Sequence, residues 1–246
     1  MAEIIDAYCT LGSERETRLT PEDLLRWMDR ARIDRAVVAP EDREIAVVNR
    51  SGNDRILGLA DHHAGRLIPA CTVNPWFGAI GAEELRRAAA AGARLLVLAP
   101  ARQGFCLGDE VADDLLAAAA ELGVPVYVHT GPHSHAAPTQ LLLVATRHPQ
   151  ARLILGHCGS TDYAADMPAV LRAAPQNVWF ELSLVRPWNA AAYVKASSPA
   201  QFLFGSSAPR NDPVFELSQF NEHLPIDEYP DVYGGNLARL LAEARA

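Results

Sequence analysis

Strand-like and helix-like segments alternate along the whole sequence, and this alternation restricts the fold more than any other feature. Eight short apolar segments of strand length are separated by segments with helical periodicity, and few of the connections are turns only. Strands joined through helices run parallel, because the helix crossover returns the chain to the same end of the sheet. Eight such units in 246 residues have the size of a (β/α)8, or TIM, barrel. We therefore predict an α/β chain that forms this barrel as one domain over residues 1–246.

The competing fold is a doubly wound open parallel sheet. That fold usually carries a glycine-rich phosphate loop after its first strand. The corresponding segment here, "DAYCTLGSE", has no G-x-G-x-x-G pattern. This difference favours the barrel.

Several helices can be placed from the residues at their ends. Thr20 and Pro21 predict the start of a helix over residues 20–33, as N-cap and first helical residue. Residues 43–65 are expected to be helical with an interruption at Ser-Gly-Asn, residues 51–53. An irregular tail, residues 221–236, is expected to cover the barrel or a neighbouring subunit. It ends in residues 234–246, whose apolar docking face is made by Leu237, Leu240 and Leu241.

Composition and charge limit the partners of the chain. Lys and Arg number 22 and Asp and Glu 30, so the net charge is −8, which argues against nucleic acid and anionic membranes as partners. No apolar stretch has the roughly 18 residues of a membrane span, and the N-terminus lacks the pattern of a signal peptide. The cysteines form no C-x-x-C pair, which is typical of a reduced protein. A cytoplasmic location is the expectation.

In a barrel, alternate strand residues point inward, and the functional site lies at the carboxyl ends of the strands. In the first strand, we expect Ile5, Ala7 and Cys9 to face the helices and Asp6, Tyr8 and Thr10 to face the interior. In the sixth strand, Leu153, Leu155 and His157 are expected to share a face. Applied to all strands, the rule places one set of side chains at the mouth, with Glu181 deeper: Tyr8, Thr10, Asn74, His129, His157, Ser183 and Ser207.

Two inward histidines on neighbouring strands are unusual for a packed core. They are either a hydrogen-bonded core pair or functional groups, and their place at strand ends favours function. His129 and His157 suit proton transfer near neutral pH, with Glu181 orienting one imidazole. Ser207 can form hydrogen bonds, or act as a nucleophile if a histidine lies beside it.

The remaining candidate residues suggest how a substrate is bound. Tyr8, Thr10 and Asn74 can supply hydrogen bonds to a substrate or a developing oxyanion. One arginine follows each of three strand ends, and guanidinium groups bind carboxylates through two parallel hydrogen bonds. These arginines indicate a small anionic substrate, and they are Arg102, Arg186 and Arg210.

At several strand ends the chain resembles the amidohydrolase superfamily. The segments "IIDAYCT", "ELGVPVYVHTG", "HPQARLILGHCG", "VWFELS" and "FLFGSSAP" follow one another in the order of the amidohydrolase-related (amidohydrolase 2) branch. The resemblance covers nearly the whole chain. It implies a TIM barrel and places the chain among hydrolases, lactonases and decarboxylases.

Most of the residues that bind metal in this family are replaced. The family's I-D-x-H-x-H has Tyr8 and Thr10 at its two histidine positions, and its G-x-K-L-H has Val97 and Ala99 at the lysine and histidine. The aspartate of the family's F-G-S-D-x-P is Ser207. Of the usual inward set, only His129 and His157 carry over.

These replacements lead us to expect no bound metal and no other cofactor. A catalytic zinc site usually has three protein ligands, and the residues that carry over supply two. The alternative is one divalent metal, such as zinc, at His129 and His157, completed by the loop residues His133 and His135.

Three hypotheses about function follow. The first is a metal-independent hydrolase or lactonase that acts on a small carboxylated compound through acid–base chemistry of the histidines. The second is a degenerate member that binds a small ligand or a protein partner without turnover. The third is a metal-dependent hydrolase or decarboxylase with relocated ligands. By analogy with related barrels, a homodimer is also expected.

Overall fold

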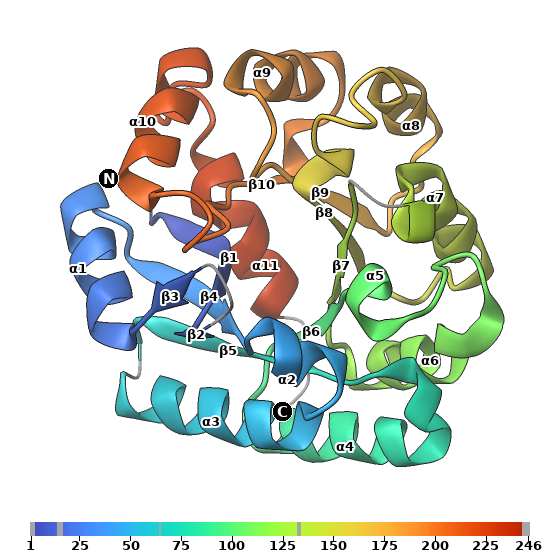
Figure 1. The fold of residues 1–246 in the computed structure, drawn as a ribbon. Helices are drawn as coiled ribbons and strands as arrows, with labels where there is room; N and C mark the ends of the chain where they lie inside the picture. Colours follow the sequence, from blue (N-terminus) through green and yellow to red (C-terminus); the bar gives the residue numbers. More distant parts are fainter. Residues whose placement is uncertain (1–2, 14–16, 64, 132–133, 243–246) are drawn as a thin grey trace.

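Eight parallel strands form a barrel in the computed structural model, which describes residues 3–13, 17–63, 65–131 and 134–242. Neighbouring strands are hydrogen-bonded in chain order (Figure 1). The TIM-barrel prediction is confirmed. The strands are β1 (Ile5–Thr10), β4 (Arg35–Ala39), β5 (Leu67–Thr72), β6 (Leu95–Leu98), β7 (Val126–His129), β8 (Leu153–Gly156), β9 (Val178–Glu181) and β10 (Phe202–Leu203).

The segment after β10 closes the barrel against β1. Ala7 N donates to Phe204 O at 3.0 Å, Ser207 N donates to Tyr8 O at 3.1 Å, and Thr10 N donates to Ala208 O at 2.7 Å. The buried carboxylate of Asp6 strengthens this seam, because it accepts hydrogen bonds from Ser206 N at 2.9 Å and Ser206 Oγ at 2.5 Å. Tyr8 and Ser207 are thereby held side by side at the mouth.

Helices surround the barrel and connect its strands (Figure 1). They are α1 (Pro21–Ala31), α2 (Asp42–Ala46), α3 (Asn49–His62), α4 (Gly78–Ala90), α5 (Pro100–Gln103), α6 (Asp113–Leu122), α7 (Pro138–Arg147), α8 (Met167–Ala173), α9 (Pro187–Ala196), α10 (Pro213–His223) and α11 (Asn236–Ala242). A two-stranded hairpin, β2 (Gly12–Ser13) with β3 (Arg18–Leu19), precedes α1. None of the helices in the described part of the chain has the length and apolar composition needed to cross a membrane.

The ends of two predicted helices can be compared with the structure. Thr20 is the N-cap of α1, and its Oγ1 accepts a hydrogen bond from Asp23 N at 3.1 Å, as predicted. The expected interruption at residues 51–53 is wrong, because these residues lie inside α3. The break falls at Val47 and Val48 instead, where the chain passes from α2 to α3.

The predicted inward and outward faces are wrong for two strands. In β1, Ile5 and Ala7 pack in the barrel interior with Tyr8, and Asp6 turns to Ser206. The pairing of β1 with β4 shifts register between Asp6 and Cys9, and such a shift interrupts the regular alternation of faces.

In β8, Leu153 and Leu155 face the helices and Ile154 faces the interior. His157 therefore does not share their face by alternation. It still reaches the mouth, because β8 ends at Gly156 and His157 has a positive φ of 64° that redirects the chain.

The C-terminal helix α11 closes the end of the barrel opposite the histidines. Leu237, Leu240 and Leu241 pack with the inward side chains of the strands, so the docking face predicted from the sequence lies against the barrel interior. Arg152, which precedes β8, donates to Leu240 O at 3.0 Å and ties α11 to the amino ends of the strands. Figure 1 shows α11 lying across the centre of the barrel.

Replacing Leu237 by alanine should lower the free energy of unfolding by about 2–5 kcal/mol, because it opens a cavity in the closed end of the barrel. Leu237 is 2% exposed, whereas Leu143 is 66% exposed. Leu143→Ala is the matched control and should change stability by no more than about 0.5 kcal/mol. Urea unfolding measures both variants. Equal stability of the two would show that α11 does not support the barrel.

Candidate active site

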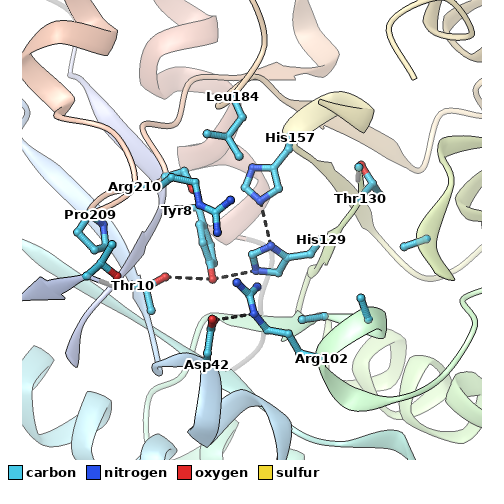
Figure 2. Close-up of a pocket in the computed structure, with 16 residues that line it drawn as sticks. Tyr8, Thr10, Asp42, Arg102, His129, Thr130, His157, Leu184, Pro209 and Arg210 are labelled. Carbon is cyan, nitrogen blue, oxygen red and sulfur yellow. Dashed lines mark hydrogen bonds and ion pairs between the residues drawn. The ribbon is translucent and has the colours of Figure 1, made fainter. Parts of the chain in front are cut away.

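A cavity of about 350 Å³ opens at the carboxyl ends of the strands. It brings together seven of the side chains that the sequence singled out, as Figure 2 shows for most of them. These seven are Tyr8, Thr10, Arg102, His129, His157, Ser207 and Arg210. The cavity lies where TIM-barrel enzymes carry their active sites.

The two histidines and Tyr8 form a continuous hydrogen-bonded chain across the cavity floor (Figure 2). Tyr8 Oη lies 2.8 Å from His129 Nε2, and His129 Nδ1 lies 2.9 Å from His157 Nε2. Thr10 Oγ1 donates to Tyr8 Oη at 3.3 Å. The two histidines are therefore hydrogen-bonded to each other, as in the core-pair interpretation, and both also line a cavity.

The hydrogen-bonded chain continues beneath the cavity to Glu181. His157 Nδ1 lies 2.7 Å from Ser183 Oγ, which donates to Glu181 Oε2 at 2.9 Å. The carboxylate, which is fully buried, also accepts from Tyr127 Oη at 2.7 Å, from His157 N at 2.9 Å and from Ser183 N at 2.7 Å. Glu181 thus orients His157 through Ser183, a refinement of the role predicted from the sequence.

With Glu181 ionised, these contacts determine where the hydrogen atoms lie. Glu181 accepts on both oxygens, so the Ser183 hydroxyl donates its only hydrogen to the carboxylate. Its oxygen must then accept from His157 Nδ1–H. His157 Nε2 is then an acceptor for His129 Nδ1–H, and His129 Nε2 is an acceptor for the hydroxyl of Tyr8. Both imidazoles are neutral in this arrangement, and Glu181 is ionised.

Burial keeps the histidines uncharged. It lowers the pKa of His157 to about 3 and lowers the pKa of His129 well below its usual value, and the positive charges of Arg102 and Arg210 act in the same direction. Burial also raises the pKa of Glu181, although its hydrogen bonds oppose the change. The site therefore holds a buried carboxylate of increased basicity behind two neutral imidazoles.

Two glycines make room for this chain of groups. A Cβ on Gly156 would lie 2.4 Å from the ring of Tyr127, and a Cβ on Gly205 would lie 2.2 Å from Glu181 Oε1. The positive φ angles of His157 (64°) and Ser207 (58°) lie in a region that residues other than glycine seldom adopt. Such strained residues gather at functional sites, which supports this assignment.

The two arginines at the cavity differ in their partners. Arg102 Nε is 2.7 Å from Asp42 Oδ1, so part of its charge is already balanced. Among the residues that the structure describes, no carboxylate forms an ion pair with Arg210. Both side chains reach toward the Tyr8–His129 contact in Figure 2. Asp42 was not foreseen from the sequence, although its place at the start of the helix after the second barrel strand could have indicated it.

Two predicted substrate-binding residues lie outside the cavity lining. Asn74 caps the short helix that follows β5: its Oδ1 accepts from Trp76 N at 3.1 Å and its Nδ2 donates to Ala46 O at 2.7 Å. Its polar atoms are thus used within the fold. Arg186 precedes α9 and lies over the ring of Trp188, 5.9 Å from its centre.

Ser207 lines the cavity without a histidine beside it. In the described part of the chain its hydroxyl has no hydrogen-bond partner, and every ring nitrogen of His129 and His157 bonds to another group. A nucleophilic serine requires an adjacent base. The geometry therefore suits Ser207 as a hydrogen-bond donor to a substrate oxygen.

The described residues offer no grouped set of ligands for a catalytic divalent metal. Within residues 3–13, 17–63, 65–131 and 134–242, no three His, Cys, Asp or Glu side chains are grouped so that they could hold an ion. The nitrogens that would coordinate it bond to each other, and hydroxyls of Tyr8 and Thr10 are their neighbours. His135 does not line the cavity, and His133 lies outside the described residues.

Comparison with known proteins identifies the family. A family model described as amidohydrolase, of the amidohydrolase 2 group, matches residues 13–242, so the chain belongs to this family. A search of curated proteins finds no match.

Solved structures share the fold at low sequence identity. A dihydroxybenzoic acid decarboxylase from Polaromonas, with bound manganese and the inhibitor 2-nitroresorcinol, has a TM-score of 0.82 at 14% identity over 100% of this chain and 98% of that chain. The 5-carboxyvanillate decarboxylase of Sphingomonas paucimobilis has a TM-score of 0.76 at 15% identity over 98% and 99%. An uncharacterised TIM-barrel protein of Bordetella bronchiseptica has a TM-score of 0.78 at 17% identity over 98% and 99%.

Gly156→Ala should lower the free energy of unfolding by about 1–3 kcal/mol, because the added methyl group collides with the ring of Tyr127. Gly58→Ala is the matched control: no atom lies within 4 Å of its added Cβ, and it should raise stability by about 0.5–1 kcal/mol as a helical substitution. Chemical denaturation compares the two. A Gly156→Ala protein as stable as the wild type would mean that Tyr127 does not pack closely over Gly156.

Proposed function

We propose that the chain is a hydrolase that acts on a small carboxylated ester or lactone and activates water through Tyr8 and His129 without a metal. One observation carries this proposal: a hydrogen-bonded chain that can accept a proton opens into the same cavity as two arginines. Water activation requires a group that accepts a proton, and the arginines can bind a carboxylate.

The direction of the hydrogen bonds favours hydrolysis. With Glu181 ionised, the hydrogen-bonded groups from Tyr8 to Glu181 can take up a proton at Tyr8, because the carboxylate at the buried end can accept one. A water molecule beside Tyr8 Oη would lose a proton as the hydroxyl of Tyr8 passes its own to His129 Nε2. The resulting hydroxide would attack the carbonyl carbon, and the proton would return to the departing oxygen. The products are a carboxylic acid and an alcohol.

The other cavity residues have roles in this reaction. Arg210, with Arg102 beside Asp42, would bind the substrate carboxylate. The Ser207 hydroxyl would donate to the oxyanion formed at the carbonyl. The hydrogen bond from Thr10 Oγ1 would stabilise the Tyr8 oxygen while its proton moves to His129. A cavity of about 350 Å³ is at the small end for ligand sites, which limits the substrate to a compact molecule.

Decarboxylation is the second candidate. The same hydrogen-bonded groups, starting with Glu181 protonated and every hydrogen bond reversed, would deliver a proton through Tyr8 to a carbon atom that has lost carbon dioxide and leave Glu181 ionised. Several proteins of the same fold bear the names of decarboxylases of carboxylated phenols. The non-catalytic alternative remains distinct from both, because a ligand would then be bound and recovered unchanged.

A panel of small carboxylated lactones, esters and phenols should contain a compound that the wild type converts, with acid or carbon dioxide release as the assay. His129→Ala should lower kcat/KM on that compound by about 10²–10⁴-fold, the usual contribution of a general base. His148→Ala is the matched control, because His148 bonds to Asp113 away from the cavity. Equal activity of His129→Ala and the wild type would refute the mechanism, and stoichiometric binding without conversion would favour the binding protein.

Arg210→Gln should weaken the binding of benzoate, used as a carboxylate probe, by about 10- to 100-fold, the value of one charged hydrogen bond. Arg186→Gln is the matched control and should leave benzoate affinity unchanged, because Arg186 stacks on Trp188 outside the cavity. Calorimetry measures both. Equal losses in the two variants would show that general positive charge, rather than a site at Arg210, attracts the probe.

A further inference from the structure

We propose that Glu181, which no substrate can touch, is the proton acceptor of the site, and that a proton leaving the cavity at Tyr8 reaches it through His129, His157 and Ser183. This inference rests on the proposed function for its part in turnover. Its geometry stands without a substrate, because every link is present in the protein itself.

Each link satisfies the requirement for proton transfer between neighbours. The successive distances are 2.8 Å from Tyr8 to His129, 2.9 Å from His129 to His157, 2.7 Å from His157 to Ser183 and 2.9 Å from Ser183 to Glu181. Every intermediate group offers one hydrogen and one lone pair along the path. All donors point the same way, from the cavity toward the carboxylate.

The transfer balances at every atom. The O–H bond of Tyr8 breaks as an N–H bond forms at His129 Nε2, and the Nδ1–H bond of His129 breaks as one forms at His157 Nε2. His157 Nδ1 then passes its hydrogen to Ser183 Oγ, which passes its own to Glu181. The final state has neutral Glu181, reversed hydrogen bonds, and the negative charge at Tyr8 or on the group that gave Tyr8 a proton.

Neither imidazole becomes charged in either end state. A buried imidazolium is unfavourable here, since burial and both cavity arginines oppose it. A relay avoids this cost, because each ring gains a hydrogen on one nitrogen as it loses one from the other. The burial that makes each histidine a poor base by itself is therefore compatible with its use as a link.

The hydroxyl of Tyr127 offers a second path from His157 to Glu181, parallel to that through Ser183. Tyr127 Oη lies 3.4 Å from His157 Nδ1 and donates to Glu181 Oε2 at 2.7 Å. It can replace Ser183 as the last link. Loss of either hydroxyl alone should therefore be tolerated better than loss of both.

The ring hydrogens of the wild-type histidines test the relay without any substrate. With Glu181 ionised, Ser183 Oγ and Tyr127 Oη both donate to Oε2, so His157 Nδ1 must carry the hydrogen that it shares with Ser183. Proton–nitrogen correlation spectra of histidine-labelled protein should show both rings neutral, with the hydrogen on Nδ1 of His157 and on Nδ1 of His129. A hydrogen on Nε2 of either ring would overturn the relay.

Glu181→Gln removes the proton acceptor and keeps the bonds that orient the relay. Its amide oxygen can take the position of Oε2 and accept from Tyr127 Oη, His157 N and Ser183 Oγ, but an amide takes up no proton. On a substrate from the panel above, folded Glu181→Gln should lower kcat by about 10²–10⁴-fold. Glu216→Gln is the matched control and should keep the wild-type kcat, because Glu216 is also a buried carboxyl group and its Oε1 bonds to Asn211 instead of the relay. Equal kcat for Glu181→Gln and the wild type would overturn the relay.

Turnover provides a second test, with a variant pair that keeps Glu181. On a substrate from the panel above, Ser183→Ala and Tyr127→Phe should each lower kcat by less than about 10-fold, and the double variant by about 10²–10⁴-fold with KM unchanged. Additive effects, or a change in KM alone, would overturn the relay. If no compound is converted, the proposed function fails while the histidine spectra still decide the relay.

Discussion

The hydrogen bonds to the carboxylate of Glu181 are the constraint on which the rest of the site depends. Four donors meet this one buried group, from the side chains of Tyr127 and Ser183 and from the backbone of His157 and Ser183. They connect β7, β8 and β9 directly beneath the cavity. Because a carboxylate with these donors can only accept, it sets the direction of every hydrogen bond from Ser183 to Tyr8. Gly205 leaves room for the carboxylate of Glu181, and Gly156 leaves room for the ring of Tyr127 that donates to it.

This arrangement changes what the barrel mouth can do. In the family pattern, strand-end histidines and an aspartate hold a metal, and in this chain Tyr8, Thr10 and Ser207 stand at those positions. Hydroxyls lie 2.8 and 3.3 Å from their neighbours there, so these positions offer hydrogen-bonding groups where the family pattern has metal ligands. The barrel, its closure at the β10–β1 seam and the position of the cavity are kept, and under the proposed function a chain of proton donors would activate water.

Much of this could be predicted from residues alone, and the failures have physical causes. Alternating apolar segments predicted all eight barrel strands, and strand-end positions predicted seven cavity residues. The predicted facing of side chains in β1 and β8 was wrong because the backbone is locally irregular there. The register shift in β1 moved Ile5 and Ala7 inward, and the positive φ of His157 brought it to the mouth from a strand with the opposite alternation. Asn74 and Arg186 follow strand ends as the true cavity residues do. The partner of Asn74, the Ala46 carbonyl, is a tertiary neighbour that no sequence spacing reveals, and Arg186 lies over the ring of Trp188 instead of in the cavity.

The proposed function requires that His129 and His157 serve each other and Tyr8 as hydrogen-bond partners instead of serving a metal. The most direct test is the metal content of protein purified without chelator or added metal, measured by elemental analysis against protein concentration. The proposed function predicts far less than one zinc, manganese or iron ion per chain in folded protein whose activity survives a chelator. Close to one ion per chain, lost together with activity on chelation, would contradict it and make the histidines ligands.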